Sequence, residues 1–365
     1  MRSKKLGVMV GLAAAALVVV GCSSSDDSGD GGGGEPGAGG TAGVILPDSA
    51  TSDRWETNDR PLLEEAFAAE GVEVDIQNAG GDKAKFATLC DQMINQPVSV
   101  LLIVNLDSKS GAACTKKAAE QGIPTIDYDR LTLGGDAEYY VSFDNVAVGE
   151  KIGEGLVTCM QNNGNNDGPV ALLNGSPTDN NATLFKQGYE SVIKEAGYEI
   201  AADQSVPDWD NTKAGTIFEQ MYTKADGDFI GVAAANDGLG GATIAVLDKN
   251  GVAGKVPVTG QDATDEGLQR VLLGTQCMTV YKAIKAEAEA AASLAAAIAK
   301  GEEPAGVNGS VEDTETGEEV SAVLLVPEAI FPENVKDVVA DGFTTAENLC
   351  TTDELKKACE EYGVS

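Results

Sequence analysis

Short apolar runs alternate with amphipathic stretches along most of the chain from Ala42 onward. The runs are rich in Val, Ile and Leu, which is typical of strands buried in a parallel sheet. We predict strands at 43–48, 72–79, 99–105, 124–129 and 139–145, with helices near 59–70, 82–95 and 108–121 between them. This βαβα order predicts one doubly wound α/β lobe.

The same pattern restarts after residue 145. We predict helices near 146–160, 182–196, 212–224 and 238–250, which alternate with strands at 169–174, 198–204, 229–235 and 256–261. A strand at 277–282, an Ala-rich helix over 283–300, a hairpin around 312–319 and a tail follow. Two successive βαβα series predict two doubly wound parallel-sheet lobes. The tail is too short for a third domain, and we expect it to cross back between the lobes.

The N-terminus has the pattern of a secretory signal. Arg2, Lys4 and Lys5 precede an uncharged stretch at 6–20, and a Gly-Cys pair ends at Cys22. The sequence "VVGC" resembles a bacterial lipoprotein cleavage site, with an ordinary signal peptide as the alternative. We therefore expect residues 1–21 to be removed, and Cys22 to be lipidated and anchored to the outer face of the cell membrane. Residues 22–41 are rich in Gly, Ser and Asp, which predicts a flexible tether with a span of roughly 25 Å.

Charge and cysteine content narrow the classes of function. The chain carries 25 Lys and Arg against 58 Asp and Glu, a formal charge of −33, which argues against nucleic-acid binding. It has no histidine and no CxxC motif, so a zinc site is not expected, and we predict no cofactor. Apart from Cys22, six cysteines remain, and in an exported protein they predict up to three disulfides with fifteen possible pairings.

Position along the chain favours two of these pairings. Cys90 and Cys114 lie on consecutive predicted helices, and Cys350 and Cys359 are close together in the tail. We expect each of these two pairs to form a local disulfide. The partners of the two remaining cysteines, Cys159 and Cys277, stay open.

Polar side chains follow nearly every predicted strand. These side chains are Arg54, Trp55, Asp129, Arg130, Asp179, Asn181, Asn236 and Asp262. A single residue of this kind is commonly a turn or helix cap. Ligands of open parallel sheets bind outside the carboxyl ends of the strands, so together these residues predict a cleft between the lobes.

The segment "GSPTDNNA" (175–182) illustrates both roles. We expect Asp179 and Asn181 to reach a ligand and Asn180 or Thr178 to cap the following helix. The chain's two tryptophans, Trp55 and Trp209, lie in polar loops. An indole flanked by Asp, Asn and Arg suits a sugar ring, with a lid over the core as the alternative.

Enzyme motifs are missing or incomplete. "NDGLGGAT" (236–243) departs from GxGxxG at Thr243, and neither a P-loop nor a GxSxG motif is present. Without histidine the usual general base is absent. Paired carboxylates could still hydrolyse a glycoside, but the sequence singles out no pair. The acidic run at 312–319 lacks EF-hand spacing, and we expect a solvated hairpin. No enzymatic activity is predicted.

Seven motifs in order resemble the D-xylose-binding proteins of bacterial sugar ABC transporters, within the ribose/galactose type of periplasmic binding protein. The motifs are "DRW" (53–55), "YDR" (128–130), "SFDN" (142–145), "GSPTDNNA" (175–182), "AANDG" (234–238), "GQDA" (260–263) and "MTVYK" (278–282). The resemblance covers about residues 43–343. It implies a type I periplasmic binding protein fold, that is, two lobes joined by three crossovers.

The resemblance also implies a ligand site and a division into lobes. The implied sugar ligands are Arg54, Asp129, Arg130, Asp179, Asn181, Asn236, Asp262 and Lys282, with the ring between Trp55 and Trp209. The implied crossovers lie near Asn145, near 278–282 and within about 304–325. We therefore predict an N-terminal lobe of 42–145 plus about 281–308, a C-terminal lobe of 146–280 plus about 309–349, and an acidic tail at 350–365.

The implied function is that of a monomeric protein that delivers a monosaccharide, D-xylose or a similar pentose, to the permease and ATPase of an ABC transporter. A receptor on the same fold that feeds chemotaxis or a sensor kinase is the alternative. A sugar-responsive repressor would need a basic DNA-binding segment at the N-terminus, where this chain has its predicted signal peptide.

Overall fold

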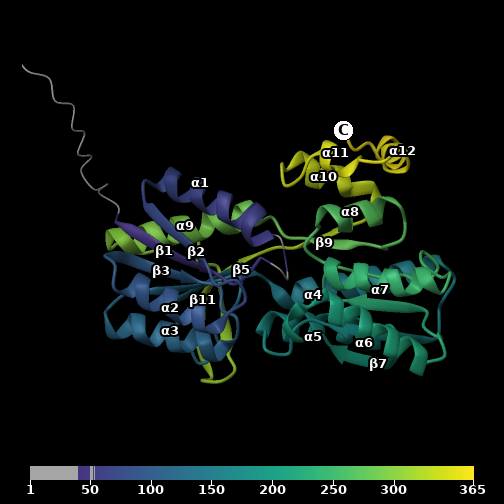
Figure 1. Cartoon of the computed structure of the whole chain (residues 1–365), viewed down its shortest axis with the longest axis horizontal. Coiled ribbons are helices and arrows are strands. Elements are labelled where there is room, and N and C mark those ends of the chain that lie inside the picture. Colours follow the sequence, from purple (N-terminus) through teal and green to yellow (C-terminus); the bar gives the residue numbers. More distant parts are fainter. Residues whose placement is uncertain (1–39, 50–51, 53) are drawn as a thin grey trace, which may run out of the picture. The chain divides into compact units, whose positions relative to one another are not determined.

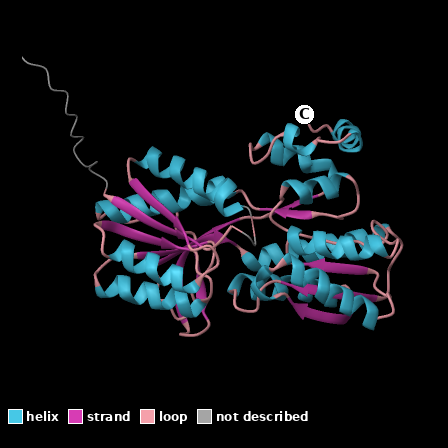
Figure 2. Cartoon of the chain, viewed as in Figure 1, coloured by secondary structure: helices cyan, strands magenta, loops and turns pink. Residues whose placement is uncertain are grey.

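The computed structural model describes residues 40–49, 52 and 54–365 of the 365-residue chain. The predicted signal peptide, Cys22, the tether up to residue 39, and Asp53 of the first motif lie outside these residues. Within the described ranges, no helix combines the length and the apolar character that crossing a membrane requires. Helices and strands form separate α/β layers, which are coloured along the chain in Figure 1 and by type in Figure 2.

A seven-stranded sheet organises the N-terminal lobe. Its strands are β1 (Thr41–Leu46), β2 (Glu73–Asn78), β3 (Val98–Ile103), β4 (Thr125–Tyr128), β5 (Tyr139–Phe143), β10 (Gly309–Asp313) and β11 (Glu318–Leu325). Their order is β10-β11-β5-β4-β3-β1-β2, and all pairs except β10–β11 are parallel. The first four predicted strands, 43–48, 72–79, 99–105 and 124–129, thus lie next to one another in one sheet.

Helices cover both faces of this sheet. The helices are α1 (Arg60–Glu70), α2 (Lys83–Ile94), α3 (Ser108–Glu120) and α9 (Ile284–Lys300). The pair α1 and α9 buries Leu63, Phe67 and Ala292 on one face, and α2 and α3 bury Phe86 and Ala118 on the other. A π-helical turn, η1 (Trp55–Asp59), precedes α1 and was not predicted.

A smaller parallel sheet organises the C-terminal lobe. Its strands are β6 (Pro169–Asn174), β7 (Glu199–Ser205) and β8 (Gly231–Ala234), in the order β7-β6-β8. Its helices are α4 (Asn145–Asn162), α5 (Asn180–Glu195), α6 (Asn211–Lys224), α7 (Asp237–Lys249) and α8 (Asp265–Leu272). The predicted strand 256–261 is wrong in extent, because only Val258 bridges β8, at Val232. Pro257 cannot donate the hydrogen bond that a full strand would need.

Two assignments to the lobes need correction. The hairpin of β10 and β11 was placed in the C-terminal lobe, but β11 pairs with β5, from Ser321↔Tyr139 to Leu325↔Phe143. The third crossover therefore follows β11, at Val326 and Pro327, and not within 304–325. After it, β12 (Glu328–Ile330) pairs antiparallel with β9 (Thr279–Tyr281). The other two crossings lie where predicted, between β5 and α4 and between β9 and α9.

The segment after β12, residues 331–365, which we call the C-terminal tail from here on and which includes the predicted acidic tail at 350–365, packs on the C-terminal lobe. The expectation that the tail crosses back between the lobes is therefore wrong. The tail contains η3 (Pro332–Asn334), α10 (Val335–Ala340), α11 (Ala346–Leu349) and α12 (Asp353–Tyr362). These elements share an apolar core with α8 and β9, in which Leu268, Val338 and Leu355 are buried. Apolar side chains on one face of the tail helices pack against α8, so the tail is held on the lobe without forming a third sheet.

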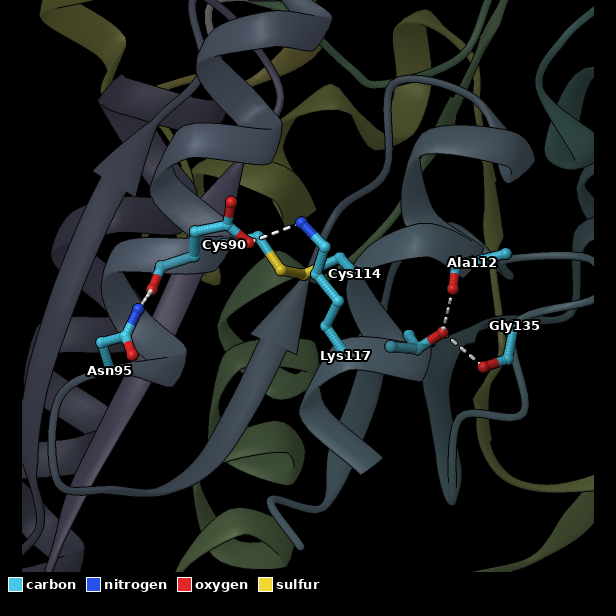
Figure 3. Close-up of a disulfide and its surroundings, with 8 residues drawn as sticks. Cys90, Asn95, Ala112, Cys114, Lys117 and Gly135 are labelled. Atoms are coloured by element: carbon cyan, nitrogen blue, oxygen red, sulfur yellow. Dashed lines mark hydrogen bonds and ion pairs between the residues drawn. A yellow bond between two sulfur atoms is a disulfide. The ribbon is translucent and has the colours of Figure 1, made fainter. Parts of the chain in front are cut away.

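All six described cysteines are paired. Cys90 of α2 bonds to Cys114 of α3 with Cα atoms 5.8 Å apart, as Figure 3 shows, and Cys350 bonds to Cys359 at 6.2 Å. Both predicted pairings are present in the structure. The open pair, Cys159 and Cys277, also forms a disulfide, with Cα atoms 6.4 Å apart, and it links α4 to the segment before β9.

Candidate functional site

The ten predicted site residues line one cavity at the carboxyl ends of the strands. They are Arg54, Trp55, Asp129, Arg130, Asp179, Asn181, Trp209, Asn236, Asp262 and Lys282. Both lobes contribute, since η1, the end of β4 and the segment after β9 face the N-termini of α5 and α7. The free space is small, with about 30 Å³ available to the centres of water molecules, or room for roughly two waters.

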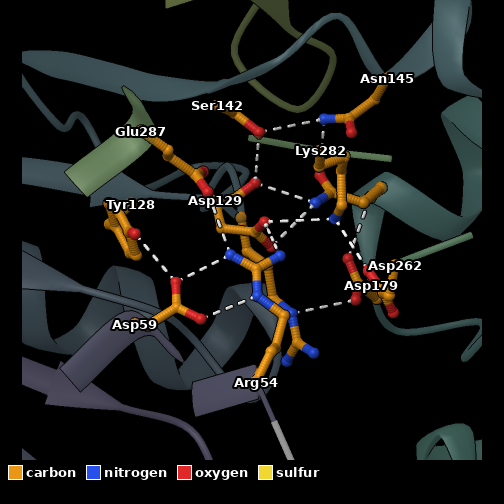
Figure 4. Close-up of polar contacts among 12 residues, drawn as sticks. Arg54, Asp59, Tyr128, Asp129, Ser142, Asn145, Asp179, Asp262, Lys282 and Glu287 are labelled. Carbon is orange, nitrogen blue, oxygen red and sulfur yellow. Dashed lines mark hydrogen bonds and ion pairs between the residues drawn. The ribbon is translucent and has the colours of Figure 1, made fainter. Parts of the chain in front are cut away.

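Arg54 is the hub of a buried ion-pair network (Figure 4). Its Nε and Nη2 donate to the two oxygens of Asp59 at 2.9 and 2.8 Å. Nη2 also donates to Oε2 of Glu287 at 3.0 Å, and Nη1 donates to Oδ2 of Asp129 at 2.8 Å. A guanidinium has five N–H groups, so one N–H of Nη1 is left without an acceptor among the described residues.

Two members of this network were missed from the sequence. Asp59 is fully buried and also accepts a hydrogen bond from Tyr128 at 2.8 Å. Glu287 is fully buried on α9. A signal for Glu287 existed, because it shares the apolar face of α9 with Ala288 and Ala291, where an unpaired charge would be costly.

The charges of this network shift the pKa values of two neighbouring carboxyl groups in opposite directions. Burial opposes ionisation of Asp129, but Arg54 and Lys282 outweigh it and lower the pKa of Asp129 to about 2. Burial and the charge of Asp129 together raise the pKa of Glu287 well above its usual range. The network therefore favours the ionised form of Asp129 and the protonated form of Glu287.

Direct contacts cross from one lobe to the other at this cavity. Nε of Arg130 lies 3.1 Å from Oδ2 of Asp179. Nδ2 of Asn181 donates to the backbone oxygen of Asp129 at 2.8 Å. Nζ of Lys282 lies 3.2 Å from Oδ1 of Asp262 and 3.6 Å from Oδ2 of Asp129. Several site residues are therefore paired with one another across the lobes in this conformation, and a ligand would exchange some of these contacts for its own.

Two of the site residues are also helix caps. Oδ1 of Asp179 accepts from the backbone of Asn181 at 2.9 Å and caps α5, so the expectation that Asn180 or Thr178 caps this helix is wrong. Oδ1 of Asn236 caps α7 by accepting from Leu239 at 2.8 Å. Capping fixes one oxygen of each side chain and leaves its other polar atom for the cavity.

The two tryptophans line the cavity from opposite lobes. The guanidinium carbons of Arg54 and Arg130 lie 4.3 and 5.4 Å from the ring centroid of Trp55, within cation–π range. Nε1 of Trp209 donates to Asp179 at 3.0 Å, and its backbone has a φ of 55°. That left-handed conformation is uncommon for a bulky residue, and it turns the indole into the cavity.

Gly175 makes room for this indole. A Cβ atom built at Gly175 would lie 2.0 Å from Cη2 of Trp209. We expect Gly175→Ala to displace the indole, shift tryptophan emission to longer wavelength and lower the free energy of unfolding by about 1–3 kcal/mol. Fluorescence and urea denaturation measure both effects. Gly215→Ala is the matched control, because nothing lies within 4 Å of its added methyl group. Equal behaviour of the two variants would contradict this packing.

Further residues of the cavity were not predicted. Gln261, Phe185 and Ser52 also line it. Oε1 of Gln261 and Nε1 of Trp55 are buried without a hydrogen-bond partner among the described residues. Gln261 lies beside Asp262 in the "GQDA" motif, which was the only sequence signal for it. The cavity thus offers unpaired donors and acceptors next to aromatic rings, the surroundings that a small polyhydroxylated molecule requires.

A buried carboxyl group supports the loop that carries Asp129 and Arg130. The backbone nitrogen and Oγ1 of Thr132 donate to Asp127 at 2.6 and 2.7 Å, and Asn105 donates to Oγ1 of Thr132 at 2.9 Å. Burial raises the pKa of Asp127 to about 7. The loop is therefore coupled to a group that titrates near neutral pH.

This pKa predicts a pH dependence of stability. The folded pKa of about 7 exceeds the unfolded value of about 3.9, so folding favours protonated Asp127. Its contribution to the free energy of unfolding falls between about pH 4 and pH 7, by up to roughly 4 kcal/mol. We expect this difference to shrink in Asp127→Asn when both proteins are denatured with urea at pH 5, 6, 7 and 8. Parallel pH profiles would contradict the assignment.

The described acidic side chains of this cavity are not grouped as metal ligands. No group of three or more acidic or cysteine side chains suited to a metal ion occurs among residues 40–49, 52 and 54–365. The carboxylates of the cavity are instead paired with arginine and lysine. The arrangement is suited to binding a neutral polar ligand.

Comparison with known proteins agrees with this geometry. Residues 43–303 match the family described as "Periplasmic binding protein domain". The chain is 34% identical to the D-xylose-binding periplasmic protein of Escherichia coli, over 81% of this chain and 88% of that protein. It is 28% identical to the multiple sugar-binding periplasmic receptor ChvE of Rhizobium radiobacter, over 83% of this chain and 90% of that protein.

A solved structure extends the comparison to the fold. The carbohydrate transporter solute binding protein of Chloroflexus aurantiacus, in complex with D-glucose, superimposes with a TM-score of 0.76 at 26% identity. The match covers 84% of this chain and 97% of that one. The predicted type I fold is confirmed. The chain therefore belongs to the periplasmic binding protein family, and within it is similar to the D-xylose-binding proteins.

Proposed function

We propose that this protein captures a monosaccharide outside the cytoplasm, with D-xylose as the preferred sugar, and delivers it to the permease of an ABC transporter. The convergence of ten side chains from both lobes on one small cavity is the observation that carries this proposal. Asp129 and Asp262 would accept hydrogen bonds from sugar hydroxyls, and the amide nitrogen of Asn236 would donate to one. The 34% identity to a D-xylose-binding protein supports the choice of sugar.

Binding would proceed by opening and closing of the lobes about the three crossovers. A sugar must enter a cavity that holds only about 30 Å³ of free space, so the cross-lobe pair of Arg130 and Asp179 has to separate. Hydroxyl groups that bridge both lobes then stabilise the closed form relative to the open form. The closed form would dock on the permease. No chemical step is involved, and the protein would act as a monomer without enzymatic turnover.

Tryptophan fluorescence and calorimetry test the proposed function. Both tryptophans line the cavity, so saturation with D-xylose is expected to change intrinsic emission without background from other indoles. D-Glucose is expected to bind more weakly, because its additional hydroxymethyl group must displace packed side chains. The absence of both a spectral change and heat with D-xylose would overturn the proposal. Equal affinities for the two sugars would overturn only the pentose preference.

The predicted anchor is part of this proposal. Cys22 lies outside the described residues, and its lipidation rests on the sequence pattern alone. The protein is expected to partition with membranes in its native host, and Cys22→Ala to release it or block its processing. A soluble wild-type protein with an unmodified N-terminus would contradict the anchor and leave sugar binding unaffected.

A receptor role is the second candidate. The similarity to a multiple sugar-binding receptor supports it, because a closed sugar complex could equally contact a signalling partner. Loss of D-xylose uptake on deletion of the gene favours transport. Unchanged uptake with loss of a sugar response favours the receptor.

A further inference from the structure

A second and larger cavity adjoins the first. It has a volume of about 620 Å³ and shares Ser52, Arg54, Asn236 and Asp262 with the inner cavity. We call it the outer chamber, and it is further lined by Thr57, Asn58, Asn211, Glu266, Phe343 and Asn348. Its volume lies in the range of ordinary small-molecule sites, whereas the inner cavity holds only about 30 Å³ of free space.

The C-terminal tail builds one wall of the outer chamber. The ring of Phe343 packs edge-on against Tyr281 with centroids 5.1 Å apart. Oγ1 of Thr344 donates to Asp265 at 2.5 Å, and Gln269 donates to the backbone oxygen of Asn348 at 3.0 Å. This wall lies beyond residues 43–303, which match the family. The outer chamber is therefore built partly by a segment that the family match does not include.

The chemistry of the lining selects a neutral polyhydroxylated ligand. Its lining contains two cations, Arg54 and Arg270, and four acidic residues, Asp237, Asp262, Asp265 and Glu266, so the chamber has no excess positive charge to hold an anion. Amide and hydroxyl groups lie beside the aromatic Phe343, the combination that binds sugar rings.

Two residues of the lining have surroundings that matter for a ligand. Asp262 is 7% exposed, and its Oδ1, although 3.2 Å from Lys282, lacks hydrogen-bonding geometry with any described residue. Asp262 lines both cavities, so a ligand that extends from one to the other would pass beside its carboxylate. The side-chain amide of Asn211 packs against Gly238. A Cβ atom at position 238 would lie only 2.5 Å from Oδ1 of Asn211, so the glycine makes room for this amide.

We propose that the outer chamber is a second sugar subsite, so that the protein binds a pentose disaccharide with one ring in each cavity. This inference rests on the proposed function, because the inner ring occupies the site assigned to D-xylose. Asn211 and Asn348 bind the outer ring, and Phe343 packs against it. D-Xylose alone fills only the inner cavity.

Calorimetric titration of the mature chain with D-xylose and with xylobiose tests the second subsite. Wild type is expected to bind both sugars. Asn211→Ala and Asn348→Ala are each expected to weaken xylobiose binding about fivefold, the effect of one lost hydrogen bond. Both variants should bind D-xylose within about twofold of wild type. Asn162→Ala, which removes an exposed amide at the end of α4, is the matched control and should change neither affinity.

The outcomes separate this inference from the proposed function. Binding of D-xylose without binding of xylobiose overturns the second subsite and leaves monosaccharide binding intact. Xylobiose binding that is unchanged in both variants places the outer ring elsewhere and also overturns it. Failure of both sugars to bind overturns the proposed function, and the second subsite with it.

Discussion

Replacing Arg54 with alanine is expected to lower the free energy of unfolding by about 3–5 kcal/mol, the cost of breaking a buried ion pair on one side. The side chain of Arg54 is 4% exposed and pairs with Asp59, Asp129 and Glu287. Its removal leaves the buried carboxylate of Asp59 without a cation, since Lys282 is near Asp129 alone among these three acids, and it takes away the hydrogen-bond donor of Glu287. Urea denaturation at neutral pH measures the loss.

A surface arginine provides the control for this experiment. Arg60 pairs with Glu56 at 2.6 Å, but the two side chains are 27% and 35% exposed. Arg60→Ala is expected to cost no more than about 1 kcal/mol, because solvent screens the pair. A loss for Arg54→Ala as small as that for Arg60→Ala would show that the buried network does not stabilise the fold.

The second large effect is expected on sugar affinity. Asp262→Asn should weaken D-xylose binding by about 2–3 kcal/mol, roughly 30- to 150-fold, because it removes a charged acceptor and the partner of Lys282. Asparagine is chosen because Asp262 has a φ of 94°, which asparagine accepts better than alanine. Calorimetry at neutral pH gives the affinity.

An exposed aspartate controls for a general charge effect. Asp248→Asn on α7 removes one negative charge from the surface and is expected to leave the affinity unchanged. Affinities for Asp262→Asn and Asp248→Asn that both equal that of wild type would remove Asp262 from the sugar site.

The convergence of the proposed site residues on one cavity could be predicted from the sequence because parallel sheets place all strand carboxyl ends at one edge. Apolar runs located β3 and β6, and the polar residues after strands then had to converge. The ten predicted residues line one cavity for this reason. Periodicity likewise located α2 and α3 well enough to predict the disulfide between Cys90 and Cys114.

Long-range pairing could not be predicted in the same way. The sequence pattern of β11 does not say which sheet the strand joins. Its pairing with β5 in the structure assigns it to the N-terminal lobe. The third crossover was misplaced for that reason. The disulfide between Cys159 and Cys277 spans 118 residues, and no local pattern signals such a contact.

The residues that support Arg54 were also missed, although a charged residue on the apolar face of α9 was a signal for Glu287. Asp59 and Glu287 follow no strand, and they act by orienting Arg54. Asp179 caps α5 and also contacts Arg130 and Trp209. The sequence could not assign the cap to Asp179, because the same residue types serve as helix caps and as ligand-binding residues.

A crystal structure of the protein grown with saturating D-xylose tests the central claim most directly. The account predicts density for a single pentose ring in the inner cavity, bounded by Trp55 and Trp209, with Asp129, Asp262 and Asn236 within hydrogen-bonding distance of its hydroxyl groups. Density for the sugar at any other place, or an inner cavity that still holds the Arg130–Asp179 pair and no sugar, would contradict it.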